Sequence, residues 1–142
     1  MRAWGSRSFE NEAACDWAEE MLGHGIGFVD ATLDKSIIVK AKYLTLYDSA
    51  VAIAACEVVA RLMACNFFPC PDSVKVVEWA SSNNETVPCG LLQKAIDVID
   101  HILSRSTGNF APWQTEDFKA RWHENVWDIR RQISSIMPAH EI

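Results

Sequence analysis

Hydrophobic residues recur along most of the chain at intervals of three and four, the spacing that gathers side chains on one face of an α-helix. In the first such segment, Ala13, Trp17 and Met21 share a side. The second segment ends in Ile37-Ile38-Val39, a β-branched run that also fits a strand. The pattern predicts helices over residues 10–22, 26–39, 49–64, 73–80, 88–105 and 116–137.

Short polar residues precede several of these segments, where their side chains can accept hydrogen bonds from the first turn of a helix. We expect Ser8 or Asn11 to cap the first helix. Asp48 should cap the third helix and Thr115 the last, while Gly23 should end the first. Together the helices and their short connections predict an all-α fold.

The chain has 142 residues, which is enough for one hydrophobic core and too few for two. The sequence contains no internal repeat, low-complexity tract or long linker. We therefore expect residues 1–142 to form a single-domain bundle of five or six helices with a long C-terminal helix.

The segment from Ala50 to Ala64 is apolar on both sides, as is usual for a central, buried helix. Glu57 is the exception, and alanines surround it at offsets of three and seven residues. One hypothesis is that an N-terminal arm around Trp4-Gly5 packs on these alanines and donates hydrogen bonds to Glu57. The alternative is a solvated Glu57 paired with Arg61, four residues further along.

The net charge of −6 and the pI of about 5.1 argue against a nucleic-acid partner, because no basic stripe can neutralise phosphates. Residues 1–34 hold seven acidic side chains against Arg2 and Arg7. Four of the acids fall on one helical face: Glu12, Asp16, Glu19 and Glu20. This face is either a solvated surface or a contact surface that attracts a basic protein.

Six tryptophans are many for a chain of this length, so we expect aromatic packing or an aromatic contact surface. Trp113 and Trp127 lie off the apolar seam of the last helix and are candidate anchors for a protein partner. A second group is expected to have a structural role: Trp4, Gly5, Phe9, Asn11, Trp17, Glu57 and Arg61.

Five cysteines at no regular spacing favour reduced thiols and a cytoplasmic protein, with a disulfide between Cys65 and Cys70 as the alternative. The first residues lack the apolar core of a secretory signal. Glu57 and Arg61 interrupt the most apolar run before it could span a bilayer, so we expect no membrane contact.

Candidate chemistry is sparse. Cys65 and Cys70 have no matching second pair, so the cysteines and histidines do not form a zinc pattern. Cys89 begins the helix that carries His101, about 18 Å away by helical rise, so the two cannot form a nucleophile and base. Asp97 and His101 share a helical face. This arrangement fits three alternatives: an ion pair, a solvated edge or a catalytic dyad. We expect no catalytic residue, metal or cofactor.

The opening W-G-x-x-x-F-E-N-E-x-A-x-D-W and the helix A-x-A-A-C-E-V-V-A resemble a bacterial family of small domains of unknown function. That family has aspartate where this chain has Glu12, and alanine where it has Cys56. The residues that carry the resemblance are Trp4, Gly5, Phe9, Glu10, Asn11, Asp16, Trp17, Ala55, Glu57, Val58, Val59 and Ala60.

The resemblance implies a helical fold and a bacterial or phage-like origin but no settled activity. By analogy with families that accompany toxin genes, it suggests an immunity protein that neutralises a cationic, nuclease-type toxin. A non-enzymatic protein-binding domain is therefore the first hypothesis. The alternatives are a small hydrolase or metal-dependent enzyme with a site between helices, and a structural module that self-associates into a homo-oligomer.

Overall fold

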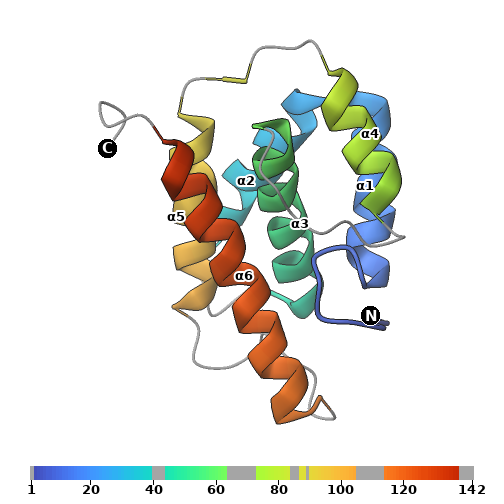
Figure 1. Ribbon diagram of the computed structural model, residues 1–142, viewed down its shortest axis with the longest axis vertical. Helices are drawn as coiled ribbons and strands as arrows, with labels where there is room; N and C mark the ends of the chain where they lie inside the picture. Colours follow the sequence, from blue (N-terminus) through green and yellow to red (C-terminus); the bar gives the residue numbers. More distant parts are fainter. Residues whose placement is uncertain are drawn as a thin grey trace.

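Six α-helices account for the regular structure in the computed structural model, which describes residues 2–39, 44–63, 73–83, 87–88, 90–104 and 114–137. The helices form a bundle with a long C-terminal helix, which confirms the all-α fold class (Figure 1). They are α1 (Glu12–His24), α2 (Ile26–Ile38), α3 (Leu46–Leu62), α4 (Val74–Ser82), α5 (Leu91–Leu103) and α6 (Glu116–Ile136).

Helix α3 is the centre of the bundle, as its apolar composition predicts. All residues from Ala52 to Ala60 are buried, and α3 packs against each of the other five helices. In Figure 1, α1 and α4 lie on one side of α3, and α5 and α6 lie on the other. A helix surrounded in this way must be apolar on nearly every side, which explains why α3 lacks an obvious polar face.

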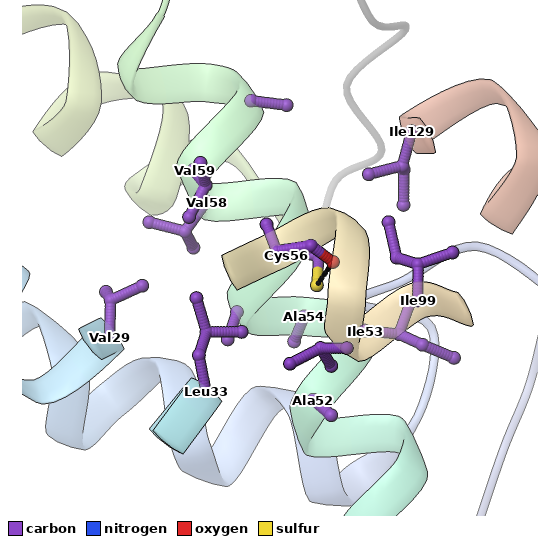
Figure 2. Close-up of a cluster of buried hydrophobic side chains, with 14 of the residues drawn as sticks. Val29, Leu33, Ala52, Ile53, Ala54, Cys56, Val58, Val59, Ile99 and Ile129 are labelled. Carbon is purple, nitrogen blue, oxygen red and sulfur yellow. Dashed lines mark hydrogen bonds between the residues drawn. The ribbon is translucent and has the colours of Figure 1, made fainter. Parts of the chain in front are cut away.

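The core on either side of α3 is built from aliphatic side chains (Figure 2). Val29 and Leu33 of α2 pack on one side, while Ile99 of α5 and Ile129 of α6 pack on the other. The Cys56 thiol is buried between them and donates a hydrogen bond to the carbonyl oxygen of Ala95 at 3.5 Å. Burial raises the pKa of this thiol, so Cys56 is an inert core residue.

Two of the expected caps are confirmed. The Asn11 side chain accepts a hydrogen bond of 2.8 Å from the Ala14 N–H, and Thr115 accepts one of 3.1 Å from Phe118. The expected cap of α3 was wrong, because Thr45 is the N-cap and Asp48 lies three residues inside the helix. The two residues exchange hydrogen bonds between side chain and backbone, so Asp48 completes a capping box.

Helix ends also differ from the sequence pattern where glycines are involved. Helix α1 continues past Gly23 to His24, and Gly25, with a positive φ of 79°, provides the C-cap. Gly90 has a φ of 84°, so α5 begins after it at Leu91. Residues 26–38 are helical, so the strand alternative for the β-branched run is wrong. Ile37 and Ile38 are exposed at the end of the helix, which is held in the bundle by the buried Val29 and Leu33 of its earlier turns.

Ion pairs connect α5 to the helices on both sides of it. The Lys94 ammonium lies 2.6 Å from Asp30 and 2.8 Å from Asp34, both on α2. The Arg130 guanidinium of α6 makes two hydrogen bonds with Asp100, at 2.8 and 3.1 Å. These contacts fix α5 between α2 and α6. Among the described residues, no helix combines the length and the apolar character needed to cross a lipid bilayer.

Candidate protein-binding surface

The residues before α1 fold back on themselves and form an N-terminal arm, defined here as residues 2–11. The Trp4 N–H donates a hydrogen bond of 3.0 Å to the Glu10 carbonyl, and Ala3 forms an antiparallel bridge with Asn11. The Glu12 N–H donates one of 2.8 Å to the carbonyl of Arg2. The start of α1 is therefore held by the arm as well as by the Asn11 cap.

Gly5 leaves space for the Glu10 carboxylate beside the backbone of the arm. A Cβ atom on Gly5 would lie 2.5 Å from Cδ of Glu10, which is too close for any real contact. The Glu10 carboxylate is held there because it accepts a hydrogen bond of 3.1 Å from the Arg7 N–H. Together, Gly5 and Glu10 close the turn that reverses the arm.

Two of the expected structural aromatics are buried, but Trp4 is not. Phe9 is 1% exposed and Trp17 is 6% exposed, whereas Trp4 is 46% exposed with the Arg2 guanidinium 5.5 Å from its ring centre. The prediction that Trp4 packs over Glu57 is therefore wrong. Its backbone is committed to Glu10 within the arm, and this turn leaves the indole on the surface.

The arm lies beside the beginning of α3 (Figure 1). It shares a small cavity with Ser49 and Ile53 of α3, and its Ser8 hydroxyl accepts a hydrogen bond of 3.0 Å from Asn125 of α6. Glu57 is not among the described residues that line this cavity. Of the described alanines in the expected patch around Glu57, only Ala50 borders it. The arm therefore joins α1, α3 and α6 at one end of the bundle.

Glu57 and Arg61 form an ion pair on α3, with 3.5 Å between Oε2 and Nη2. Each side chain is only 7% exposed, so the pair is buried and not at a solvated edge. The expected pairing is confirmed, while the expected solvation is wrong because neighbouring helices cover this part of α3. Glu57 belongs to the core of the protein and is not part of a surface site.

The four acids predicted to share a face of α1 are all exposed. Glu12, Asp16 and Glu20 follow one another at intervals of four residues, which places them in a row along the helix; we call these three the acidic row. Within the described part of the chain, no lysine or arginine forms an ion pair with the row. Glu19 lies beside it, 3.9 Å from the exposed Lys75 ammonium.

The other acids near the N-terminus already make contacts within the protein. The acidic residues of this region therefore fall into two groups, those with such contacts and those that face outward. Glu10 closes the turn of the arm, and Asp30 and Asp34 hold Lys94. The acidic row and Glu19 are what remains as outward-facing charge. Composition predicted the excess of acids, but only the structure shows which of them are available to a partner.

A groove that the sequence did not predict lies between α1, α2 and the start of α3, with a volume of about 330 Å³. Trp17 and Phe28 form part of its wall, with ring centres 5.9 Å apart. Glu20, the last residue of the acidic row, lies on its rim. The residues lining the groove are Trp17, Glu20, Phe28, Ala31, Thr32, Lys35, Ser36, Val39, Leu44, Tyr47, Asp48 and Val51.

Trp127 is 43% exposed, as its position off the seam of α6 predicts. The Arg130 guanidinium lies 5.7 Å from its ring centre while also binding Asp100. Trp127 and the acidic row belong to different helices, α6 and α1, which Figure 1 shows on opposite sides of α3. Trp113, the second predicted anchor, lies outside the described residues.

Among the described residues considered for chemistry, Asp97 and His101 have separate hydrogen-bond partners. Asp97 accepts a hydrogen bond of 2.9 Å from Gln93, and Nε2 of His101 lies 2.6 Å from the carbonyl oxygen of Val39. The described residues contain no group of three or more histidine, cysteine, aspartate or glutamate side chains able to hold a metal. Cys65, Cys70 and Cys89 lie outside the described residues.

Comparison with known proteins identifies one family. The sequence model of a domain of unknown function, DUF4259, matches residues 2–125, which cover the arm, α1 to α5 and the first part of α6. This agrees with the resemblance to a family of small domains that has no settled activity. No curated protein and no solved structure matches the chain.

Proposed function

The chain belongs to the DUF4259 family, and from this premise we propose that it is a non-enzymatic domain that binds a basic protein. The observation that carries the proposal is the acidic row of Glu12, Asp16 and Glu20. In its more specific form, the proposal is that the domain is a cytoplasmic immunity protein that neutralises a cationic, nuclease-type toxin.

The spacing of the acidic row supports a role in recognition. Like charges four residues apart repel one another and destabilise a helix by about 0.2–0.5 kcal/mol per pair. Glu12 lies in the first turn of α1, where the helix dipole favours an acid, whereas Asp16 and Glu20 lie beyond that turn and gain nothing from the dipole. Asp16 and Glu20 therefore stabilise neither the helix nor the core, and a partner that supplies positive charge readily explains them.

The mechanism requires only long-range attraction followed by surface contact. A concentrated negative potential accelerates the encounter with a basic protein, and the effect is largest at low ionic strength. A nuclease is a fitting partner, because a surface that binds phosphates is rich in lysine and arginine. A non-enzymatic role is supported by Asp97 and His101, which have different hydrogen-bond partners, Gln93 and the Val39 carbonyl.

The proposal is tested with the gene directly upstream of the one that encodes this chain, where a toxin gene is expected. The upstream product would be expressed in a host cell with the wild-type chain, or with a neutralised-row variant that carries Glu12→Gln, Asp16→Asn and Glu20→Gln. A matched control removes three exposed acids elsewhere, by Asp97→Asn, Glu116→Gln and Glu124→Gln.

We expect the upstream product to stop growth, and we expect the wild-type chain and the control to restore it. The neutralised-row variant should restore growth weakly, because it associates more slowly. A harmless or acidic upstream product would overturn the immunity role. Full rescue by the neutralised-row variant would show that the acidic row is not the binding surface.

A further inference from the structure

We propose that the groove between α1, α2 and the start of α3 receives a large apolar side chain from a basic helical segment of the partner. This inference rests on the proposed function, since it adds a specific pocket to the electrostatic surface of the acidic row. It names both the site and the chemistry of the segment that binds there.

The groove is suited to an apolar group, because the polar side-chain atoms of Trp17, Thr32 and Ser36 in its wall already have partners. The Trp17 indole N–H donates a hydrogen bond of 2.9 Å to the Thr32 hydroxyl, which donates one of 2.9 Å to the Phe28 carbonyl. The Ser36 hydroxyl donates one of 2.8 Å to the Thr32 carbonyl. The rest of the wall that a ligand can contact is mainly apolar and comes from Trp17, Phe28 and the aliphatic residues.

The rim of the groove selects for positive charge. Glu20 connects the groove directly to the acidic row, and the exposed Asp48 lies on the same rim. Lys35 is the only cation among the groove-lining residues that the structure describes. With Asp16 one turn along α1 from Glu20, acids outnumber cations among the described residues beside the groove. An apolar side chain flanked by lysines or arginines complements both features.

An amphipathic helix is the segment that can present both groups together. The acidic row runs from Glu12 to Glu20, eight residue steps along α1 or about 12 Å by helical rise. A partner helix with cations at the same spacing can face the row along this length, while its apolar stripe meets the groove. Tyr47, which is 48% exposed on the groove, extends the apolar contact toward α3.

The volume of about 330 Å³ is sufficient for one large side chain. It is also close to the lower end of the range for small-molecule pockets, about 300–1,000 Å³. The competing occupants are therefore a small apolar molecule and a second copy of this chain. Each gives a different result in the experiment below.

The test uses three helical peptides of about 18 residues, long enough to cover the acidic row. The first contains only lysine and leucine in an amphipathic pattern. The second keeps the lysines and replaces each leucine with alanine, and the third keeps the leucines and replaces each lysine with glutamate. Amide signals of the full-length protein would be followed by NMR, with Asp16 reporting the row and Thr32 and Val51 reporting the groove.

We expect the lysine–leucine peptide to shift all three signals and to bind about tenfold more tightly than the lysine–alanine peptide, because it buries an apolar side chain. Equal affinities of the two basic peptides, with a shift of the Asp16 signal alone, would show that the groove is not a binding site. That result would still agree with binding at the acidic row. A protein that binds neither basic peptide would contradict the proposed function as well. Equally tight binding of the glutamate–leucine peptide would overturn the charge argument.

A variant that fills the groove separates this site from the rest of the surface. Ala31→Phe adds a ring at the rim, and Ala120→Phe places the same ring on the exposed side of α6 as a control. We expect Ala31→Phe, and not Ala120→Phe, to make the lysine–leucine peptide bind no more tightly than the lysine–alanine peptide. If the groove signals respond to 1-octanol but to neither basic peptide, the inference is overturned in favour of a small apolar ligand. If they respond only to protein concentration, it is overturned in favour of a dimer.

Discussion

The indole N–H of Trp17 donates a hydrogen bond of 2.9 Å to the hydroxyl oxygen of Thr32, and this contact ties α1 to α2 at the wall of the groove. Trp17 is 6% exposed, so its N–H has little access to water if Thr32 is changed. One hydrogen bond thus links the helix that carries the acidic row to the helix that completes the groove.

Thr32→Val replaces the hydroxyl with a methyl group of similar size and leaves the Trp17 N–H buried without an acceptor. We expect the free energy of unfolding to fall by about 1–3 kcal/mol, the cost of an unsatisfied buried donor. Urea unfolding followed by circular dichroism measures this change. Thr32→Ser keeps the hydroxyl and should lose less; a Thr32→Val protein as stable as wild type would show that the bond contributes nothing.

Gly5→Ala should destabilise the arm, because the new Cβ collides with the Glu10 carboxylate and displaces it from the Arg7 N–H. The loss of that hydrogen bond predicts a cost of about 1 kcal/mol in thermal or chemical unfolding. Gly27→Ala is the matched control. Gly27 lies in α2 with open space around its Cα, so alanine should stabilise the helix by up to about 1 kcal/mol. Changes of the same sign would contradict the assigned role of Gly5.

Lys94→Met should weaken the connection between α5 and α2 and leave Asp30 and Asp34 facing each other across one turn. The Lys94 ammonium is partly exposed, so we expect a loss of about 1 kcal/mol at neutral pH. Lys75→Met, at the fully open pair with Glu19, should change stability much less. Equal effects of the two substitutions would argue against the connecting role of Lys94.

The contribution of Lys94 should also depend on pH in a defined direction. Hydrogen bonds from the ammonium to Asp30 and Asp34 raise the pKa of Lys94 above its ordinary value of 10.5. A raised pKa stabilises the folded state fully below pH 10.5, and this stabilisation is lost as the pH rises through the folded-state value. The stability difference between wild type and Lys94→Met should therefore be constant near neutrality and shrink above pH 10.5. A difference that grows with alkaline pH would contradict the assignment.

Glu57→Gln removes the negative charge of the buried pair on α3 while keeping the shape of the side chain. Breaking a buried ion pair by neutralising one partner costs about 3–5 kcal/mol, so a fall in melting temperature of many degrees is expected. Asp128→Asn, at an exposed pair with Arg131 on α6, is the control and should have little effect. A shift of only a degree or two for Glu57→Gln would mean that the charge is not needed for folding.

The helices could be predicted well because their signals are local. Asn11 and Thr115 precede their helices directly and cap them, and the seam from Trp122 to Ile133 is visible as spacing alone. The prediction for Asp48 was wrong because an acidic residue is favoured at two positions, the N-cap and the third helical residue of a capping box. Only the position of Thr45 relative to the first helical turn distinguishes the two.

The site could be predicted only in part, because exposure and grooves depend on packing between distant segments. The acids of α1 follow from helical periodicity, and they are exposed as expected. The groove has walls from α1, α2 and α3, so no single segment of sequence indicates it. Trp4 was misplaced for a similar reason, since a turn closed by Gly5 and Glu10 determines where its indole points.

The association rate is the measurement that tests the central claim most directly. The upstream gene product would be mixed with the wild-type chain, the neutralised-row variant and the matched control in a stopped-flow instrument. Salt would be varied across the range in which screening changes the reach of charges, about 0.01 to 1 M.

At low salt we expect the wild type and the control to associate about tenfold or more faster than the neutralised-row variant, because Glu12, Asp16 and Glu20 steer the basic partner. The three rates should converge as salt is added. Equal rates for wild type and the neutralised-row variant at low salt, with the same salt dependence, would contradict the assignment of the acidic row as the binding surface.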